Sequence, residues 1–229
     1  MELTKYGHSC LTVQLDVAGR PVRLCLDPGT LSESEAALEG ADAILITHGH
    51  PDHLNDDVVA AFLIANDAVR LYGPHDALAR LAAREDARSF ADRLVVLGAD
   101  EDVDVLGVSV RTLGGQHALI HPLLKTIDNL GYIIEGRVYH PGDSLVVPAG
   151  PATLEVLLVP VWAPWSKTSE VVDFIAAVRA KRAYGIHDAP LQPSAHAIIG
   201  AQLSGLGGRT GSVYEQWAAG ESITVGEQA

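Results

Sequence analysis

A short segment of the chain, residues 47–53, reads Thr-His-Gly-His-Pro-Asp-His and is dense in potential metal ligands. Directly before it stands the apolar run 43–46, which predicts a buried strand. Four side chains in the segment can donate to a metal ion: His48, His50, Asp52 and His53. Imidazole and carboxylate are the groups that zinc and similar divalent ions bind in proteins. The segment is therefore predicted to hold metal.

The spacing of these residues indicates that one loop contributes to two adjacent sites. His48 and His50 are two residues apart, so on extended backbone both imidazoles point the same way. Pro51 suits the start of a helix, because it has no N–H to lose there. Asp52 and His53 lie on that new turn, so their side chains leave in another direction.

Three more candidate ligands each follow a predicted strand farther along the chain: His117, Asp143 and His187. Loops at strand ends are where α/β enzymes gather functional groups. His121 is an alternative to His117 as the ligand, and we favour His117. His196 is an alternative to His187, but it falls inside a predicted helix, whereas His187 terminates a strand.

Other residues are candidates for contact with a substrate. Trp162 and Trp165 follow a buried strand, where they form either an aromatic wall of a pocket or packing at the edge of the fold. His8 either bonds to backbone in a structural corner or approaches the metal site. His121 lies in an irregular loop that is a second candidate wall. His140 is expected to be a packed or supporting residue rather than a ligand.

Composition bounds the class of protein and its partners. The chain has 229 residues, of which 48% are hydrophobic and 20% charged, and this length can bury a core without disulfides. The net charge is −13, from 16 basic and 29 acidic residues. That balance argues against binding to nucleic acid or to an anionic membrane, so we expect a small-molecule substrate. The oligomeric state cannot be read from the sequence.

The two cysteines bear on the cellular compartment. Cys10 and Cys25 fall in the predicted strands 9–16 and 21–27, which could form a hairpin that places them nearly opposite each other. A disulfide is then conceivable, but sparse cysteine and no apparent secretion signal favour reduced thiols in the cytoplasm. No apolar run reaches the roughly 18 residues that a membrane helix needs.

The order of predicted elements indicates one compact α/β domain over residues 1–229. The first 27 residues favour strands, and later strands alternate with helices. Helices are predicted at 34–38, 55–66, 76–88, 169–181 and 194–203. Further strands are predicted at 43–47, 69–72, 94–97, 103–105, 108–113, 132–134, 137–140, 154–161, 183–187 and 222–225.

These motifs together resemble those of the metallo-β-lactamase fold superfamily of metal-dependent hydrolases. Within it the chain is most similar to a small, single-domain branch that includes L-ascorbate-6-phosphate lactonase-like proteins. The resemblance is carried by residues 7–10, 26–28, 41–53, 139–144 and the strand that ends at His187.

The resemblance implies a four-layer αββα sandwich with metal ions at one edge of its two sheets. Carried over by position, the first ion is held by His48, His50 and His117. The second is held by Asp52, His53 and His187, with Asp143 as the bridge. Zinc is the expected metal, with manganese and iron as alternatives, because a mixed nitrogen and oxygen site does not choose by affinity alone.

Such a site predicts hydrolysis. Two divalent ions roughly 3.5–4 Å apart can share a water and lower its pKa towards about 7. Asp52 would orient the resulting hydroxide, which would cleave an ester, lactone, amide or phosphodiester bond. Two divalent ions less Asp52, Asp143 and one hydroxide leave a formal charge of about +1, so the small substrate could be anionic.

Other functions on the same core fit the sequence less well. A ribonuclease would be expected to have a basic surface, and a flavodiiron-type redox enzyme a flavodoxin domain for which there is no room. A glyoxalase II-like thioesterase often carries glycines where this chain has Leu54 and Asn55. The non-enzymatic alternative is a sensor or ligand-binding module, in which removing metal abolishes binding and no substrate is turned over.

Overall fold

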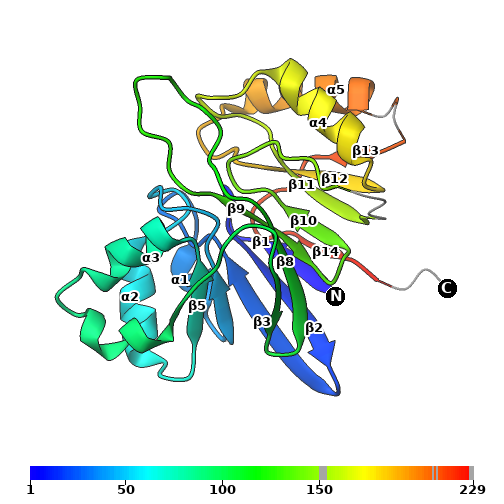
Figure 1. Cartoon of the computed structure of the whole chain (residues 1–229). Coiled ribbons are helices and arrows are strands. Elements are labelled where there is room, and N and C mark those ends of the chain that lie inside the picture. Colours follow the sequence, from blue (N-terminus) through cyan, green and yellow to red (C-terminus); the bar gives the residue numbers. More distant parts are fainter. Residues whose placement is uncertain (150–153, 208, 210, 227–229) are drawn as a thin grey trace.

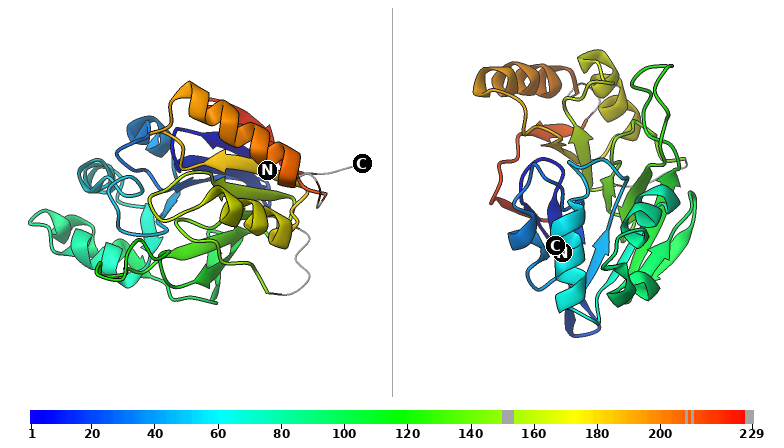
Figure 2. Two further views of the ribbon diagram at one scale, coloured as in Figure 1. Left: turned by 90° about the horizontal axis from the view of Figure 1, so that it is seen from above. Right: turned by 90° about the vertical axis from the view of Figure 1, so that its left-hand side faces the viewer.

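The computed structural model describes residues 1–149, 154–207, 209 and 211–226. Two mixed β-sheets pack face to face, and helices cover the outer face of each (Figures 1 and 2). The predicted α/β class and four-layer αββα sandwich are confirmed. The single domain over residues 1–229 stays a prediction.

The first sheet has the strand order β14-β1-β2-β3-β4-β5-β6. Its strands are β1 (Glu2–Lys5), β2 (Leu11–Val17), β3 (Arg20–Leu26), β4 (Ala43–Leu45), β5 (Arg70–Gly73), β6 (Leu94–Val96) and β14 (Ser222–Thr224). The strands from β14 to β3 pair antiparallel, and those from β3 to β6 pair parallel. The strands β3 and β4 therefore end at the same edge of the sheet.

The second sheet has the strand order β13-β12-β11-β10-β9-β8-β7. Its strands are β7 (Asp102–Val105), β8 (Val108–Gly114), β9 (Leu130–Ile134), β10 (Val138–His140), β11 (Val156–Pro160), β12 (Arg182–Ile186) and β13 (Val213–Glu215). β8 and β10 are both antiparallel to β9, and β10 to β13 pair parallel. As a result β8, β10, β11 and β12 all end at one edge.

Helices complete the two outer layers. α1 (Ser34–Leu38), α2 (Asp56–Ala65) and α3 (His75–Ala82) cover the first sheet, and α4 (Thr168–Val178) and α5 (Pro193–Gly207) cover the second (Figure 1). The helix α2 begins where Asn55 caps it, since the Asn55 side chain accepts the Val58 backbone N–H at 3.4 Å. Two short 3₁₀ turns, Ala87–Ser89 and Ala91–Arg93, lead into β6.

The alternation of side chains along β4 and the residue after it explains why residues 43–46 are all apolar. Ala43 and Leu45 face the core between the two sheets, whereas Ile44 and Ile46 belong to the cluster beneath helices α1 to α3. Successive strand residues point to opposite faces, so a strand covered on both faces must be apolar throughout. The apolar run thus fixes the strand that ends at the histidine loop.

One expected element was wrong in its extent, and one strand was missed. The helix expected over 76–88 ends at Ala82, because Ala87 and Phe90 turn back to bury their side chains against the same helical layer. The strand β13 was not expected, and its three residues at a sheet edge carry too short a pattern to recognise. The segment 117–129 contains no helix or strand, as predicted.

Both cysteines lie in the cluster beneath helices α1 to α3. Cys10 and Cys25 are buried free thiols, and Cys25 lies opposite Thr12 in the β2–β3 pair. Within the ranges that the structure describes, no helix combines the length and apolar character needed to cross a membrane.

The two sheets are joined at the edge where their parallel strands end. The backbone N–H of Leu130 donates to the Thr47 carbonyl at 2.8 Å, and the Tyr132 hydroxyl donates to the Ile46 carbonyl at 2.6 Å. Gly142 packs against Thr47 with φ of 61°, and a Cβ there would lie 2.7 Å from the Thr47 Cβ. Only glycine fits both the backbone and the space.

Gly142→Ala should destabilise the fold more than Gly136→Ala. Both glycines have nearly the same φ, 61° and 62°, but nothing lies within 4 Å of a Cβ at Gly136. The left-handed backbone alone costs about 1–2 kcal/mol, and overpacking adds roughly 1–3 kcal/mol. Chemical denaturation of both variants measures the difference, and equal losses of stability would contradict the packing argument.

Candidate metal centre

The predicted ligands converge where strands of both sheets end. The loop after β4 carries His48 to His53, and β8, β10 and β12 are followed by His117, Asp143 and His187. Their side chains form two groups whose potential ligand atoms all lie within 4.8 Å of one another. Candidate ligands that are distant in sequence therefore meet because the strands that precede them end at the same edge of the fold.

The first cluster contains His48, His50, His117 and Asp143. His48 Nε2 lies 3.1 Å from His50 Nδ1, and His117 Nε2 lies 3.3 Å from Asp143 Oδ2. Asp143 Oδ2 is also 4.0 Å from His48 Nε2. The three histidines are those that the resemblance assigns to one ion.

The second cluster contains Asp52, His53 and His187, together with His8. Asp52 Oδ2 lies 3.4 Å from His187 Nε2, 3.9 Å from His53 Nε2 and 3.1 Å from His8 Nε2. Three of the four residues are those that the resemblance assigns to a second ion. His8 joins them from the loop between β1 and β2.

Asp143 lies between the clusters. Its Oδ1 is 3.1 Å from His53 Nε2, and its Oδ2 is 3.2 Å from His187 Nε2 as well as 3.3 Å from His117 Nε2. One carboxylate therefore faces histidines of both groups. This position agrees with the bridging role that the resemblance implies, while the role of each residue as a ligand stays a prediction.

The donor atoms fit a bound cation. Four buried polar atoms point into the centre without an aligned hydrogen bond: Nε2 of His53, His117 and His187, and Oδ1 of Asp143. A buried polar atom without a partner costs about 1–3 kcal/mol. Divalent cations bound here would satisfy all four atoms at once, and a nitrogen and oxygen set suits zinc, manganese or iron.

Hydrogen bonds at Nδ1 hold the His117 and His187 imidazoles so that Nε2 faces the centre. His117 Nδ1 donates to the Ala118 carbonyl and His187 Nδ1 donates to the Trp162 carbonyl, each at 2.6 Å. Because a carbonyl only accepts, these bonds place the proton on Nδ1 and leave Nε2 to face the centre.

Asp27 holds His53 in the same way, and the sequence reasoning missed it as a functional residue. Its Oδ2 lies 2.7 Å from His53 Nδ1, and the Thr47 backbone N–H donates to Oδ1 at 2.7 Å. The carboxylate is fully buried at the end of β3. The available signal was an acidic residue directly after an apolar strand, followed by Pro28.

His8 orients Asp52 in this arrangement. The Ala189 backbone N–H donates to His8 Nδ1 at 3.3 Å, so the proton of this imidazole is on Nε2, which donates to Asp52 Oδ2. Its ring centroid is 4.1 Å from that of His187. His8 therefore combines the two alternatives, because it bonds to backbone and also lies at the candidate metal site, and its contact with substrate stays a prediction.

The tryptophans and His121 occupy different places around the centre. Trp165 Nε1 donates to Asp143 Oδ2 at 3.0 Å, so its half-buried ring borders the first cluster. The Trp162 side chain is 39% exposed and therefore is not core packing. His121 lies outside both clusters, where its Nδ1 accepts the Leu123 backbone N–H at 3.2 Å. Their contact with substrate stays a prediction.

His140 supports the same region without facing either cluster. Its Nε2 donates to the Ser9 carbonyl at 3.1 Å, and its Nδ1 accepts the Gly142 N–H at 3.0 Å. Both nitrogens are occupied by backbone, as expected of a packed, supporting histidine.

The electrostatics describe a site that holds protons when it holds no cation. Burial lowers the pKa of His187, but the Asp143 and Asp52 carboxylates, 3.2 and 3.4 Å from its Nε2, outweigh burial and raise that pKa to about 9. Burial also opposes a charge on His53, yet the Asp143 and Asp27 carboxylates raise its pKa well above the ordinary value. Burial disfavours the charge on Asp143, but the surrounding imidazoles hold its pKa well below its usual range.

Residues 2–187 match the family described as the Beta-lactamase superfamily domain, and the chain belongs to that family. Protein Rv0786c of Mycobacterium tuberculosis is 37% identical over 209 residues, covering 89% of this chain and 92% of its own. A UPF0173 metal-dependent hydrolase of Aeropyrum pernix is 31% identical over 157 residues, covering 62% of this chain and 61% of its own.

A solved structure supports the fold independently of close sequence identity. Igni18, described as a metallo hydrolase from the archaeon Ignicoccus hospitalis, superposes with a TM-score of 0.71 at 16% identity and covers 99% of both chains. The resemblance to the metallo-β-lactamase fold superfamily that the sequence indicated is therefore confirmed. The lactonase-like subtype stays a prediction.

Asp27→Asn should weaken metal binding without removing a ligand. Loss of the carboxylate behind a metal-bound histidine typically costs about 10–100-fold in affinity. Asp42→Asn is a matched control, because Asp42 also accepts a backbone N–H, from Arg23 at 2.9 Å, but lies away from the centre. Competition with a fluorescent chelator measures both affinities. Equal values for the two variants would contradict the supporting role of Asp27.

Metal uptake at pH 7 should release protons. The His187 pKa of about 9 means that its imidazole is protonated at pH 7, and that proton must leave Nε2 before a cation binds. Affinity should therefore increase as pH rises from 7 towards 9, by about tenfold per pH unit for each displaced proton. Titration calorimetry in two buffers with different heats of ionisation measures the release, and identical heats would exclude it.

Proposed function

We propose that this protein is a metal-dependent hydrolase with a two-cation centre that cleaves an ester, lactone, amide or phosphodiester bond in a small molecule. The observation that carries the proposal is the set of four buried, unpartnered ligand atoms shared between two clusters. The three imidazole nitrogens lie 3.1–3.3 Å from oxygens of Asp143 without an aligned hydrogen bond, and two cations bound among them would satisfy all four atoms. The names of the Aeropyrum relative and of Igni18 as hydrolases support the same class of reaction.

The cations and the side chains have separate tasks in this proposal. A pair of divalent ions held by these residues would supply Lewis acidity and lower the pKa of a water molecule towards neutral pH. Neutral imidazoles hold the ions, and Asp143 offsets part of their charge while facing both groups. The indole N–H of Trp165 fixes the orientation of that carboxylate.

Asp52 is the residue that we assign to orienting the attacking water. Burial opposes its charge, but the nearby His187 imidazole and the hydrogen bond from His8 keep its pKa below the ordinary value, so it is a carboxylate at neutral pH. Its side chain is 26% exposed, more than the other carboxylate of the centre, at 4%. It can therefore accept a hydrogen bond from water that enters with the substrate.

Access to the centre favours an enzyme over a buried structural metal site. His50 and Asp52 are partly exposed, whereas His48, His53, His117 and His187 are buried. Structural zinc sites are closed by protein ligands, but catalytic sites keep an open position. The partial exposure of His50 and Asp52 agrees with access by a small, exchangeable substrate. The cytoplasm is the proposed location.

His48→Ala and Asp143→Ala should each lose metal and hydrolysis while the fold persists. We expect the metal content to fall and kcat/KM to drop by about 1,000-fold or more, since a catalytic ion contributes several kcal/mol. His75→Ala is the control, because His75 is exposed at the start of α3 and belongs to neither cluster. Elemental analysis, circular dichroism and a panel of chromogenic esters, lactones and phosphodiesters provide the measurements.

Two outcomes decide between the alternatives. Full turnover in either ligand variant would contradict the proposed centre. Metal-dependent binding of panel compounds by the wild-type protein, with no turnover of any of them, would favour a sensor or binding module instead.

A further inference from the structure

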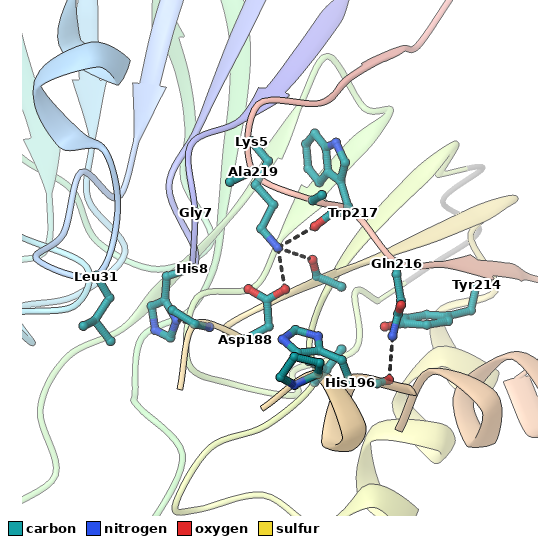
Figure 3. Close-up of a pocket in the computed structure, with 15 residues that line it drawn as sticks. Lys5, Gly7, His8, Leu31, Asp188, His196, Tyr214, Gln216, Trp217 and Ala219 are labelled. Atoms are coloured by element: carbon teal, nitrogen blue, oxygen red, sulfur yellow. Dashed lines mark hydrogen bonds and ion pairs between the residues drawn. The ribbon is translucent and has the colours of Figure 1, made fainter. Parts of the chain in front are cut away.

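A cavity of about 510 Å³ adjoins the second cluster (Figure 3). Its volume lies within the range of roughly 300–1,000 Å³ that is usual for small-molecule sites. It lies between the end of β1, the end of β12 and the segment that follows β13. Its walls include His8, Leu31, His196, Tyr214, Trp217 and Ala219.

The cavity reaches the candidate metal centre through His8. This side chain lines the cavity and also donates to Asp52 Oδ2 at 3.1 Å. Asp188 and Ala189, which line the cavity as well, directly follow His187. Only the His8 imidazole therefore separates the cavity from Asp52 of the second cluster, so a molecule bound at that cluster would lie next to the cavity.

Lys5, the lysine in the cavity wall, already uses all its N–H donors in hydrogen bonds within the protein. Lys5 Nζ donates to the Gly185 carbonyl at 3.0 Å, to the Trp217 carbonyl at 2.8 Å and to Asp188 Oδ2 at 2.7 Å, as the dashed lines in Figure 3 show. An ammonium group has three N–H donors, and all three are used. The side chain is also 2% exposed, so its charge is balanced by Asp188 inside the protein.

The remaining walls offer apolar surface together with the His196 imidazole, the Tyr214 hydroxyl and the Gln216 amide. Leu31, Val161 and Trp217 provide aliphatic and aromatic contacts. The Gln216 amide nitrogen donates to the His196 carbonyl, which uses one of its two N–H donors (Figure 3). An anionic group entering here would meet the carboxylate of Asp188 and no free ammonium or guanidinium group among the described residues that line the cavity.

We propose that this cavity binds an uncharged aliphatic or aromatic part of the substrate, while the bond to be hydrolysed lies at the metal centre. The inference rests on the proposed hydrolase function and narrows its substrate class. Burying an anion without a partner is costly, whereas apolar surface gains from burial here. The formal charge of the centre suggested an anionic substrate. Any negative charge of the substrate should therefore lie on groups that contact the cations, not on the part that enters the cavity.

Matched 4-nitrophenyl esters test the charge preference. The neutral pentanoate and the hydrogen glutarate ester have acyl chains of the same carbon number, but the glutarate carries a terminal carboxylate. We expect the zinc-loaded wild-type protein to hydrolyse the pentanoate with a kcat/KM at least about tenfold higher, the scale of discrimination that one or two pocket contacts give. An equal or higher value for the glutarate ester would overturn the inference.

Filling the cavity tests its location. Leu31→Trp and Ala219→Trp introduce a large ring at two partly open walls, and each should lower the ratio of pentanoate to acetate hydrolysis by about tenfold. Ala61→Trp is the control, because Ala61 is exposed on α2 and distant from the cavity walls. An unchanged ratio in both cavity variants would place the acyl chain elsewhere.

A binding measurement separates failure of this inference from failure of the hydrolase function. Neutral 4-nitrobenzyl alcohol is dialysed to equilibrium against the zinc-loaded wild type and the three tryptophan variants. We expect at least about tenfold weaker binding in the two cavity variants and none of this loss in Ala61→Trp. Equal binding in all four proteins would overturn the cavity assignment. Selective binding without hydrolysis of any ester would count against the enzyme function alone.

Discussion

The buried carboxylate of Asp143 is the constraint on which the rest of this structure depends. It lies within 4.0 Å of imidazole nitrogens from both clusters, and burial makes its charge expensive without close cationic partners. Protons on His53 and His187 provide those partners when no metal is bound. Divalent cations would replace the protons and satisfy the ligand atoms that have no aligned hydrogen bond. The buried Asp143 carboxylate therefore explains why folding the site without metal costs free energy, and why the folded site is suited to bind metal.

This constraint couples the two halves of the fold. The clusters take residues from the ends of strands in both sheets, so the sheets must stay in register at that edge for either ion to bind. Three residues there, His8, Asp27 and His187, hold left-handed backbone with φ between 43° and 59°. Such conformations cost about 1–3 kcal/mol each and persist only when their surroundings determine them. Metal binding should accordingly add to the stability of the whole sandwich, because the unfolded chain has no preformed site.

The sequence predicted the parts of the fold and site that depend on local pattern. The histidine loop 48–53 and the strand before it are contiguous, and the other candidate ligands lie one to three residues after strands that the sequence made recognisable. Asp27 was missed as a functional residue, because its role appears only once the ends of β3 and β4 are adjacent. The cavity was equally hidden, since Lys5 and Gly185 meet across 180 positions of the chain. Periodicity identifies strands and exposed ends, but it does not specify which distant side chains share one buried space.

The central claim is that two cations occupy the two clusters at once. Anomalous diffraction from crystals of the zinc-loaded protein, recorded on both sides of the zinc absorption edge, tests it most directly. We predict two anomalous peaks per chain, one among His48, His50 and His117 and one among Asp52, His53 and His187, with Asp143 contacting both. Crystals from protein saturated with zinc that show no peak at either cluster, with the side chains hydrogen-bonded to one another instead, would contradict the account.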